Sequence, residues 1–177
     1  MAKRGPEAIG PEVPRTDDLT DWREETVVLG CHGGAGTTTL RVLLKTPWDL
    51  GAYDAERGEI GTFGRPLVLT CRDSVAGTAR AAEVINVLER NGLRPAALVV
   101  VADGSGPEPS ESRARLRLVR DRVGHLVRFP FVPSLRYVDA VDADRVKLPA
   151  KARRALEEIR KACLSAATET LSQQGAG

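Results

Sequence analysis

Short apolar runs alternate with longer amphipathic segments along this chain. The apolar runs predict β-strands, because a few consecutive apolar residues bounded by polar or glycine-rich segments fit a buried strand. The run AALVVVA at 96–102 is apolar throughout, which is typical of a strand buried on both faces of a parallel sheet. The predicted strands cover residues 26–29, 67–71, 96–102 and 125–129.

The segments between these runs repeat apolar residues every three or four positions, as an amphipathic helix does. One helix is expected to follow Asp73 or Ser74, either of which can cap it, and to end near Gly92. The other predicted helices span residues 37–45, 110–123 and 150–171. In the last of these, one face carries a stripe of small or apolar side chains and one threonine: Ala152, Leu156, Ile159, Cys163, Ala166 and Thr170.

This alternation predicts a single α/β domain with a mainly parallel sheet between helices. We place the domain at residues 25–171. Residues 1–24 hold three prolines and many charges without periodicity, so we expect a disordered arm there and a disordered tail at 172–177. Residues 46–65 contain four glycines and are predicted to form a long loop.

Composition and charge narrow the class of protein. Hydrophobic residues make up 42% of the 177 residues and charged residues 28%, which is ordinary for a globular protein. The net charge of +2 gives no overall argument for nucleic-acid binding. No apolar run is long enough to span a membrane. Cys31, Cys71 and Cys163 lack the spacing of a metal site or disulfide framework, so we expect reduced thiols in a cytoplasmic protein.

The strongest chemical signal is the segment Gly30–Thr39, GCHGGAGTTT, which we call the glycine loop. It follows a predicted strand and opens a predicted helix, as a phosphate loop does. Glycines let successive N–H groups turn toward one anion, and the helix N-terminus adds its dipole. The alternative is a tight turn that binds nothing. The expected phosphate-binding residues are Gly33, Gly34, Ala35, Gly36, Thr37, Thr38 and Thr39, with the Thr38 hydroxyl placed to bind Mg²⁺.

This loop resembles the variant phosphate loop of the partitioning and division-site ATPases, the ParA/MinD family. Their loop reads glycine, lysine, two glycines, any residue, glycine, lysine, serine or threonine, threonine. The matching residues are Gly33, Gly34, Gly36, Thr38 and Thr39. The resemblance implies a P-loop NTPase-like three-layer α/β/α fold, with ATP or ADP and Mg²⁺ as the cofactors.

Both lysine positions of that family hold other residues here, His32 at the first and Thr37 at the second. In the family the first lysine acts across a dimer and the second grips the β- and γ-phosphates. Losing such a charge costs on the order of 2–4 kcal/mol in the transition state. We therefore predict a nucleotide- or phosphate-binding regulatory module with little or no hydrolysis. The alternatives are a slow ATPase with His32 or a residue of another chain replacing lysine, and an interaction protein that binds no nucleotide.

The resemblance continues over residues 67–102 and 127–171, whose strand and helix order is similar to the later part of that fold. The middle of the family's fold, which carries its metal-orienting aspartate, is expected to be missing, so the fold would be truncated. The chain also resembles short actinobacterial proteins linked with plasmids and integrative mobile elements. That likeness rests on the glycine loop and residues 129–136 and implies a protein partner from a plasmid or conjugation system. The resemblance to the ParA/MinD family implies a homodimer formed through the nucleotide face.

Other features of the sequence have simpler explanations, which we favour. Arg113, Arg117 and Arg120 share a helical face; a solvated face is the preferred interpretation and a DNA contact the alternative. Asp103 follows an apolar strand, as a metal-orienting aspartate can, but DGSG is typical of a turn. Cys31 lies beside helix-terminal amides that can lower a thiol pKa; we do not favour it as a nucleophile.

Overall fold

The protein is described by a computed structural model that covers residues 26–57 and 59–174, so the predicted arm at 1–24 lies outside the described residues. The strands are β1 (Val27–Gly30), β2 (Asp49–Ala52), β3 (Leu67–Arg72), β4 (Ala97–Val101) and β5 (His125–Phe129). The α-helices are α2 (Thr37–Leu44), α3 (Val75–Arg90), α4 (Ser110–Val119) and α5 (Ala150–Gln174). Short 3-10 helices follow as η1 (Ala55–Arg57), η2 (Arg120–Arg122), η3 (Pro133–Tyr137) and η4 (Ala140–Arg145).

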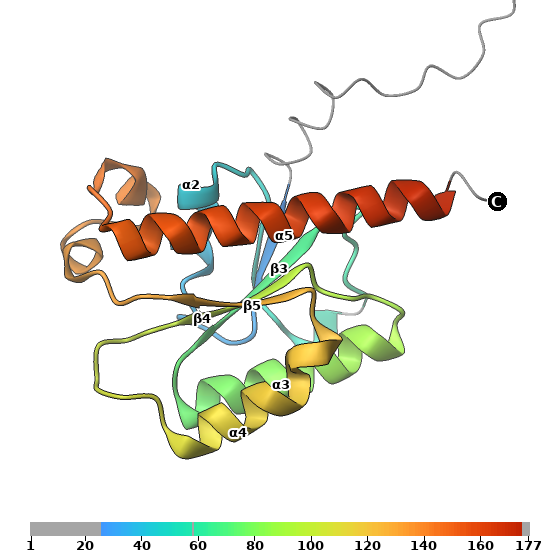
Figure 1. The fold of residues 1–177 in the computed structure, drawn as a ribbon, viewed down its shortest axis with the longest axis horizontal. Helices are drawn as coiled ribbons and strands as arrows, with labels where there is room; N and C mark the ends of the chain where they lie inside the picture. Colours follow the sequence, from blue (N-terminus) through green and yellow to red (C-terminus); the bar gives the residue numbers. More distant parts are fainter. Residues whose placement is uncertain (1–25, 58, 175–177) are drawn as a thin grey trace, which may run out of the picture.

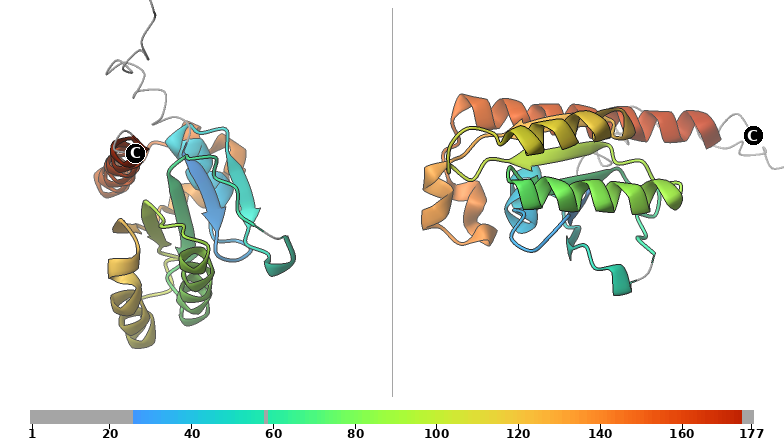
Figure 2. Two further views of the ribbon diagram at one scale, coloured as in Figure 1. Left: turned by 90° about the vertical axis from the view of Figure 1, so that its right-hand side faces the viewer. Right: turned by 90° about the horizontal axis from the view of Figure 1, so that it is seen from below.

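The five strands form one parallel sheet in the order β2-β1-β3-β4-β5. Helices α2 and α5 lie on one face of this sheet, and α3 and α4 lie on the other (Figures 1 and 2). The predicted α/β class and parallel sheet are therefore confirmed. From β1 the chain passes to β2 on one side and then returns to β3 on the other side of β1.

Alternate strand residues enter two separate cores, which explains why the central strands are apolar throughout. The core under α2 and α5 contains Val28, Val68, Val99, Val127, Leu40 and Ile159. The core under α3 and α4 contains Leu29, Leu69, Leu98, Ile85, Leu88 and Leu116. Of the stripe predicted for the last helix, Ala152, Leu156, Ile159 and Cys163 are buried.

Residues 46–65 are not one long loop, because β2 lies inside them. The sequence DLGA shows no alternation of apolar and polar residues, and β2 is an edge strand of the sheet. Backbone pairing with β1 holds it in place. The N–H of Val28 donates to the carbonyl of Trp48 at 3.0 Å, and the N–H of Tyr53 donates to the carbonyl of Gly30 at 2.7 Å. Such pairing leaves little trace in the hydrophobic pattern.

Two helices differ from the prediction at their ends. The regular part of α4 ends at Val119, and η2 continues the segment expected to be helical. Helix α5 runs to Gln174, so residues 172–174 of the predicted tail are helical. Among residues 26–57 and 59–174, we find no helix whose length and apolar character would let it cross a membrane.

Ser74 caps α3, one of the two residues predicted to do so. Its side chain accepts a hydrogen bond from the N–H of Gly77 at 3.0 Å. We expect Ser74→Ala to lower the free energy of unfolding by about 1 kcal/mol, because the Gly77 N–H loses its acceptor. Urea denaturation measures this change. Ser110→Ala is the matched control: Ser110 begins α4, which has no side-chain cap, so an equal loss there would contradict the capping role.

Candidate functional site

The glycine loop lies at the switch point of the sheet. The loop leaves the carboxyl end of β1 toward α2 on one face, while the neighbouring β3 leads to α3 on the opposite face. Because the two connections diverge, they leave a crevice between them, and ligands of open parallel sheets bind in such crevices. The sheet order thus marks this loop as the candidate site independently of its sequence motif.

The backbone of the loop requires glycine at two positions. Gly34 has a φ of 72° and Gly36 a φ of 89°, a left-handed conformation that other residues adopt only at a cost. Gly36 is the N-cap of α2. The loop is anchored to β3, because the N–H of Cys31 donates to the carbonyl of Thr70 at 2.8 Å and the Thr70 hydroxyl donates to the carbonyl of Ala35 at 2.8 Å.

The N–H groups of the loop from Gly33 to Thr39 lack hydrogen-bond acceptors among the described residues. Leu40 makes the first hydrogen bond of the helix, to the carbonyl of Gly36 at 2.9 Å. Within the described ranges, none of the backbone N–H groups from Gly33 to Thr39 donates to another protein group. Free N–H groups at a helix N-terminus carry partial positive charge and favour an anion. The loop therefore has N–H groups without a protein partner, and phosphate binding by them stays a prediction.

The three threonines of the loop point in different directions. The Thr37 hydroxyl packs beneath the loop, where a Cβ added to Gly30 would meet it at 2.4 Å. The Thr38 hydroxyl donates to Oδ2 of Asp49 in β2 at 2.8 Å. The other oxygen of Asp49 accepts from the N–H of Gly51 at 2.8 Å, which fixes the carboxylate. Thr39 lines a hollow on the opposite side of the loop.

Asp49 is the first residue of β2, so the expectation that residues 46–65 hold no apolar strand ending in an aspartate stands, but its carboxylate nevertheless meets Thr38. Thr38 and Asp49 belong to neighbouring elements, and their contact leaves the Thr38 oxygen with lone pairs for a cation. Phosphate-loop enzymes hold Mg²⁺ through such a hydroxyl and an aspartate. Among the described residues no cluster of three or more histidine, cysteine, aspartate or glutamate side chains is arranged to hold a metal. The phosphates of a ligand would therefore have to complete any Mg²⁺ site here.

His32 turns away from the loop's N–H groups. Its Nε2 accepts a hydrogen bond from the backbone N–H of Arg72 at 3.1 Å, and its Nδ1 lies 2.8 Å from the carbonyl of Gly33. Because Nε2 accepts, Nδ1 carries the proton that it donates to Gly33. Both ring nitrogens are thus used within the protein. His32 links the loop to the end of β3 and does not present a cation to a phosphate in this arrangement.

Arg72, at the end of β3, brings a positive charge to the loop. Its Nε donates to the carbonyl of Gly34 at 2.9 Å. Together with Gly34, Gly36 and Thr39 it lines a hollow of about 230 Å³. The glycine-loop motif gives no sign of this role, because Arg72 lies far from the loop in the chain. Parallel pairing of β1 with β3 places it there, with Gly30 opposite Thr70.

The far wall of this hollow comes from the segments after β4 and β5. Asp103 accepts a hydrogen bond from the N–H of Ser105 at 2.9 Å in a turn, as predicted. Hydrogen bonds from Ser105, with a smaller contribution from Arg72, lower the pKa of Asp103. Arg136 donates to the carbonyl of Asp103 at 2.9 Å, and its guanidinium stacks 4.7 Å from the centre of the Phe131 ring. The hollow is thus lined by two arginines, one carboxylate and the rings of Phe129 and Phe131.

The structure divides the predicted phosphate-binding residues among three sides of the loop. Gly34, Ala35, Gly36 and Thr39 line the hollow. Thr37 lies beneath the loop, Thr38 faces Asp49, and nothing lies within 4 Å of a Cβ added to Gly33. Sequence reasoning missed Arg72, Asp49 and Arg136. A polar residue at the end of each predicted parallel strand was the available signal for Arg72.

The three arginines for which a DNA contact is the alternative prediction lie close together. Arg113, Arg117 and Arg120 line one hollow of about 480 Å³ between α4, β5 and α5. Arg113 pairs with Glu108 at 3.2 Å, whereas Arg117 and Arg120 are exposed. This arrangement fits the solvated face that we favour, and the DNA contact stays a prediction.

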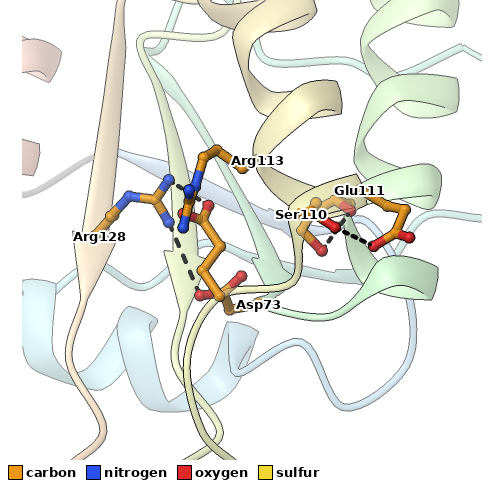
Figure 3. A network of polar contacts seen from close by, with 8 residues as sticks. Asp73, Ser110, Glu111, Arg113 and Arg128 are labelled. Atoms are coloured by element: carbon orange, nitrogen blue, oxygen red, sulfur yellow. Dashed lines mark hydrogen bonds and ion pairs between the residues drawn. The ribbon is translucent and has the colours of Figure 1, made fainter.

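A charged network joins the ends of β3 and β5 beside the site (Figure 3). Arg128 of β5 pairs with Glu108 at 2.5 Å and lies 3.8 Å from Oδ2 of Asp73. Burial is the largest influence on Glu108 and acts to raise its pKa, but hydrogen bonds from Arg128 and Arg113 outweigh it and lower the pKa. For Asp73, burial and the nearby Glu108 carboxylate raise the pKa despite Arg128.

The raised pKa of Asp73 predicts a pH-dependent stability. Its Oδ1 is buried without a hydrogen-bond partner among the described residues. The pKa of Asp73 is higher in the folded protein than in the unfolded chain, where it is near 3.9, so ionisation of this carboxyl opposes folding. The free energy of unfolding therefore falls as the pH rises from the unfolded pKa through the folded pKa. We expect Asp73→Asn to be more stable than the native chain at pH 7 and to lose this advantage below about pH 4. Urea unfolding across this range measures it.

Asp121→Asn is the control for this prediction, because Asp121 is exposed and its substitution removes one negative charge as well. A stability gain of equal size in both variants would show that overall charge, and not the burial of Asp73, is responsible.

Burial raises the pKa of the two cysteine thiols near the site. Burial, with a smaller influence of Cys71, raises the pKa of Cys31 well above its usual value. Burial and the Asp73 carboxylate raise the pKa of Cys71 to about 12. Since the thiolate is the nucleophile, Cys31 is not suited to nucleophilic catalysis, and the nearby helix amides do not reverse the effect of burial.

The chain was also compared with known proteins. Searches of protein-family models, curated proteins and solved structures find no match.

Proposed function

We propose that this protein is a P-loop NTPase-like module that binds a nucleotide or phosphate at the glycine loop and hydrolyses it little or not at all. The observation that carries the proposal is the row of unused N–H groups from Gly33 to Thr39, at the switch point of a parallel sheet. Fixed backbone donors and a helix dipole suit a phosphate without any lysine. The resemblance to the ParA/MinD loop supports the same conclusion.

Arg72 compensates in part for the missing lysines. Its guanidinium is held over the loop by the carbonyl of Gly34 and faces the hollow beside the free N–H groups. A bound phosphate would gain a charge-assisted hydrogen bond there. The adjacent hollow, with the Phe131 ring and Arg136, is where the rest of a nucleotide would lie.

Little hydrolysis is expected because the residues at the two family lysine positions, His32 and Thr37, present no cation to the loop. Thr37 is neutral and packs under the loop, and His32 is bound to the backbone at both nitrogens. Charge developing on a transferred phosphoryl group would lack its usual partner. The protein then regulates its partner through the difference between its ligand-bound and ligand-free states. The homodimer and the plasmid- or conjugation-system partner implied by the resemblances stay predictions.

A slow ATPase is the second candidate, favoured by the Thr38–Asp49 contact, which is suited to hold Mg²⁺. Phosphate release with Mg²⁺ and ATP distinguishes the two functions. We expect release at the level of a protein-free control. Release above that level that Asp49→Asn abolishes would establish the ATPase instead.

Calorimetric titration with ATP, ADP and inorganic phosphate, each with Mg²⁺, tests the binding. We expect Arg72→Ala to weaken the affinity about 10- to 100-fold, since a hydrogen bond to a charged group contributes about 1.5–3 kcal/mol. Arg72→Lys should restore part of it. Arg117→Ala, an exposed arginine on α4, should bind as the native chain does. Absence of heat and of thermal stabilisation with all three ligands would refute the proposed function.

A further inference from the structure

A larger cavity, of about 650 Å³, lies at the end of the sheet opposite the glycine loop. Its walls are the turns that lead into β3, β4 and β5 and the second half of α5. They include Arg65, Arg94, His125, Ala162, Ala166 and Glu169. In Figure 1 this half of α5 projects beyond the strands. In this half of the helix Ala162, Cys163 and Ala167 are buried. Ser165 and Glu169 on the cavity wall are exposed, and Ala166 and Thr170 are only half-buried.

The residues of α5 at this cavity are suited to contact another segment. Ala162 is buried and Ala166 half-buried, and Ser165 lies between them on the cavity wall. Small side chains on a helix let a bulky side chain approach closely, and protein interiors are otherwise packed without voids of this size. The cavity is therefore large enough for an aromatic side chain and its neighbours.

The chain enters the domain at this same end. Val27, the first residue of β1, pairs with Leu67, which lines the cavity. Burial raises the pKa of Cys163 in α5 to about 11, against a lowering influence of the nearby Thr26 side chain. An extended residue spans about 3.3 Å, so Trp22, four positions before Thr26, reaches roughly 13 Å from it.

Charge also matches the cavity to the preceding segment. Residues 16–25, TDDLTDWREE, hold five acidic residues and one arginine. Arg94 donates to the carbonyl oxygens of Asp121 at 3.4 Å and Val123 at 3.2 Å. Both of these partners are neutral, and among residues 26–57 and 59–174 no carboxylate lies within ion-pair distance of Arg94. Its charge at the rim favours an acidic segment.

We infer that residues 16–25 of this chain occupy the cavity, with the Trp22 ring against the Ala162–Ala166 face of α5 and the acidic side chains near Arg94. The segment then covers the exposed and half-buried residues that the second half of α5 presents to the cavity. This contact is independent of nucleotide binding, since it lies at the opposite end of the strands. It would tie the segment before β1 to the last helix.

Trp22 reports on this contact by its fluorescence. The chain has two tryptophans, and Trp48→Phe leaves Trp22 as the single emitter. In that background we expect blue-shifted emission and weak quenching by acrylamide, because a docked ring is shielded from water. Arg94→Glu, which repels the acidic segment, and Ala166→Phe, which fills the cavity, should each shift the emission to the red and increase the quenching.

Arg117→Glu is the control, because it makes the same charge change on α4 away from the cavity, and it should leave Trp22 shielded. Circular dichroism verifies that each variant folds, and Arg94→Gln replaces Arg94→Glu if the latter unfolds. Trp22 quenched as strongly in the folded parent as in urea would overturn the inference. Shielding that disappears on dilution would also overturn it, because the cavity would then hold the segment of a second copy.

Discussion

The Gly36→Glu variant is expected to lose nucleotide and phosphate binding. A carboxylate on Gly36 would project toward the hollow, since a Cβ there lies 3.8 Å from the Val101 side chain that lines it. Two unit charges 4 Å apart repel by about 4 kcal/mol at an effective dielectric constant of about 20. The expected loss of affinity is roughly 100- to 1000-fold, measured by calorimetry with ATP, ADP and phosphate.

Backbone strain needs a separate control, because Gly36 has a φ of 89° and a side chain costs about 1–2 kcal/mol in that conformation. Gly64 has a φ of 78° with nothing within 4 Å of an added Cβ, and it lies away from the loop. Gly64→Glu therefore carries similar strain and the same charge. It should lower the free energy of unfolding to a similar extent and bind normally. Native affinity in a folded Gly36→Glu variant would mean that the ligand binds elsewhere.

The Leu98→Ala variant is expected to lose about 2–5 kcal/mol of the free energy of unfolding. Leu98 lies in the middle of β4 and is 0% exposed in the core beneath α3 and α4. Its truncation removes buried apolar atoms and leaves a cavity that a sheet packed on both faces can close only in part. Urea denaturation at fixed pH measures the loss, which is a large share of the stability of a domain this size.

Leu118→Ala is the matched control for this core substitution. Leu118 has the same side chain on α4 but is 78% exposed, so its truncation should change the free energy of unfolding by less than about 0.5 kcal/mol. Equal losses at the two positions would mean that the central strands are not closely packed as described.

Much of the sheet follows from local sequence patterns. The four apolar runs became β1, β3, β4 and β5, because strands buried on both faces must be apolar at nearly every position. β2 escaped prediction because it is an edge strand held by backbone hydrogen bonds to β1. The residues of β2 bury little apolar surface, so apolar and polar residues do not alternate in its sequence.

The candidate site likewise combines a part that the local sequence predicts with residues that only strand pairing brings to it. The glycine loop is a local feature, because its left-handed turns and free helix amides arise within one short segment. Arg72 and Asp49 belong to the site only because β3 and β2 pair on either side of β1. Strand order is set by how whole elements pack, and hydrophobic periodicity does not encode it.

By itself, the sequence determined the α/β class, the central strands and the position of a loop rich in unused N–H groups. Tertiary structure decided which side chains meet that loop. It placed the Arg72 guanidinium above the loop and the Asp49 carboxylate beside Thr38, and it turned His32 toward the end of β3. The physical reason is that apolar burial and backbone conformation act over a few neighbouring residues, whereas contacts between strand ends depend on the order of the sheet.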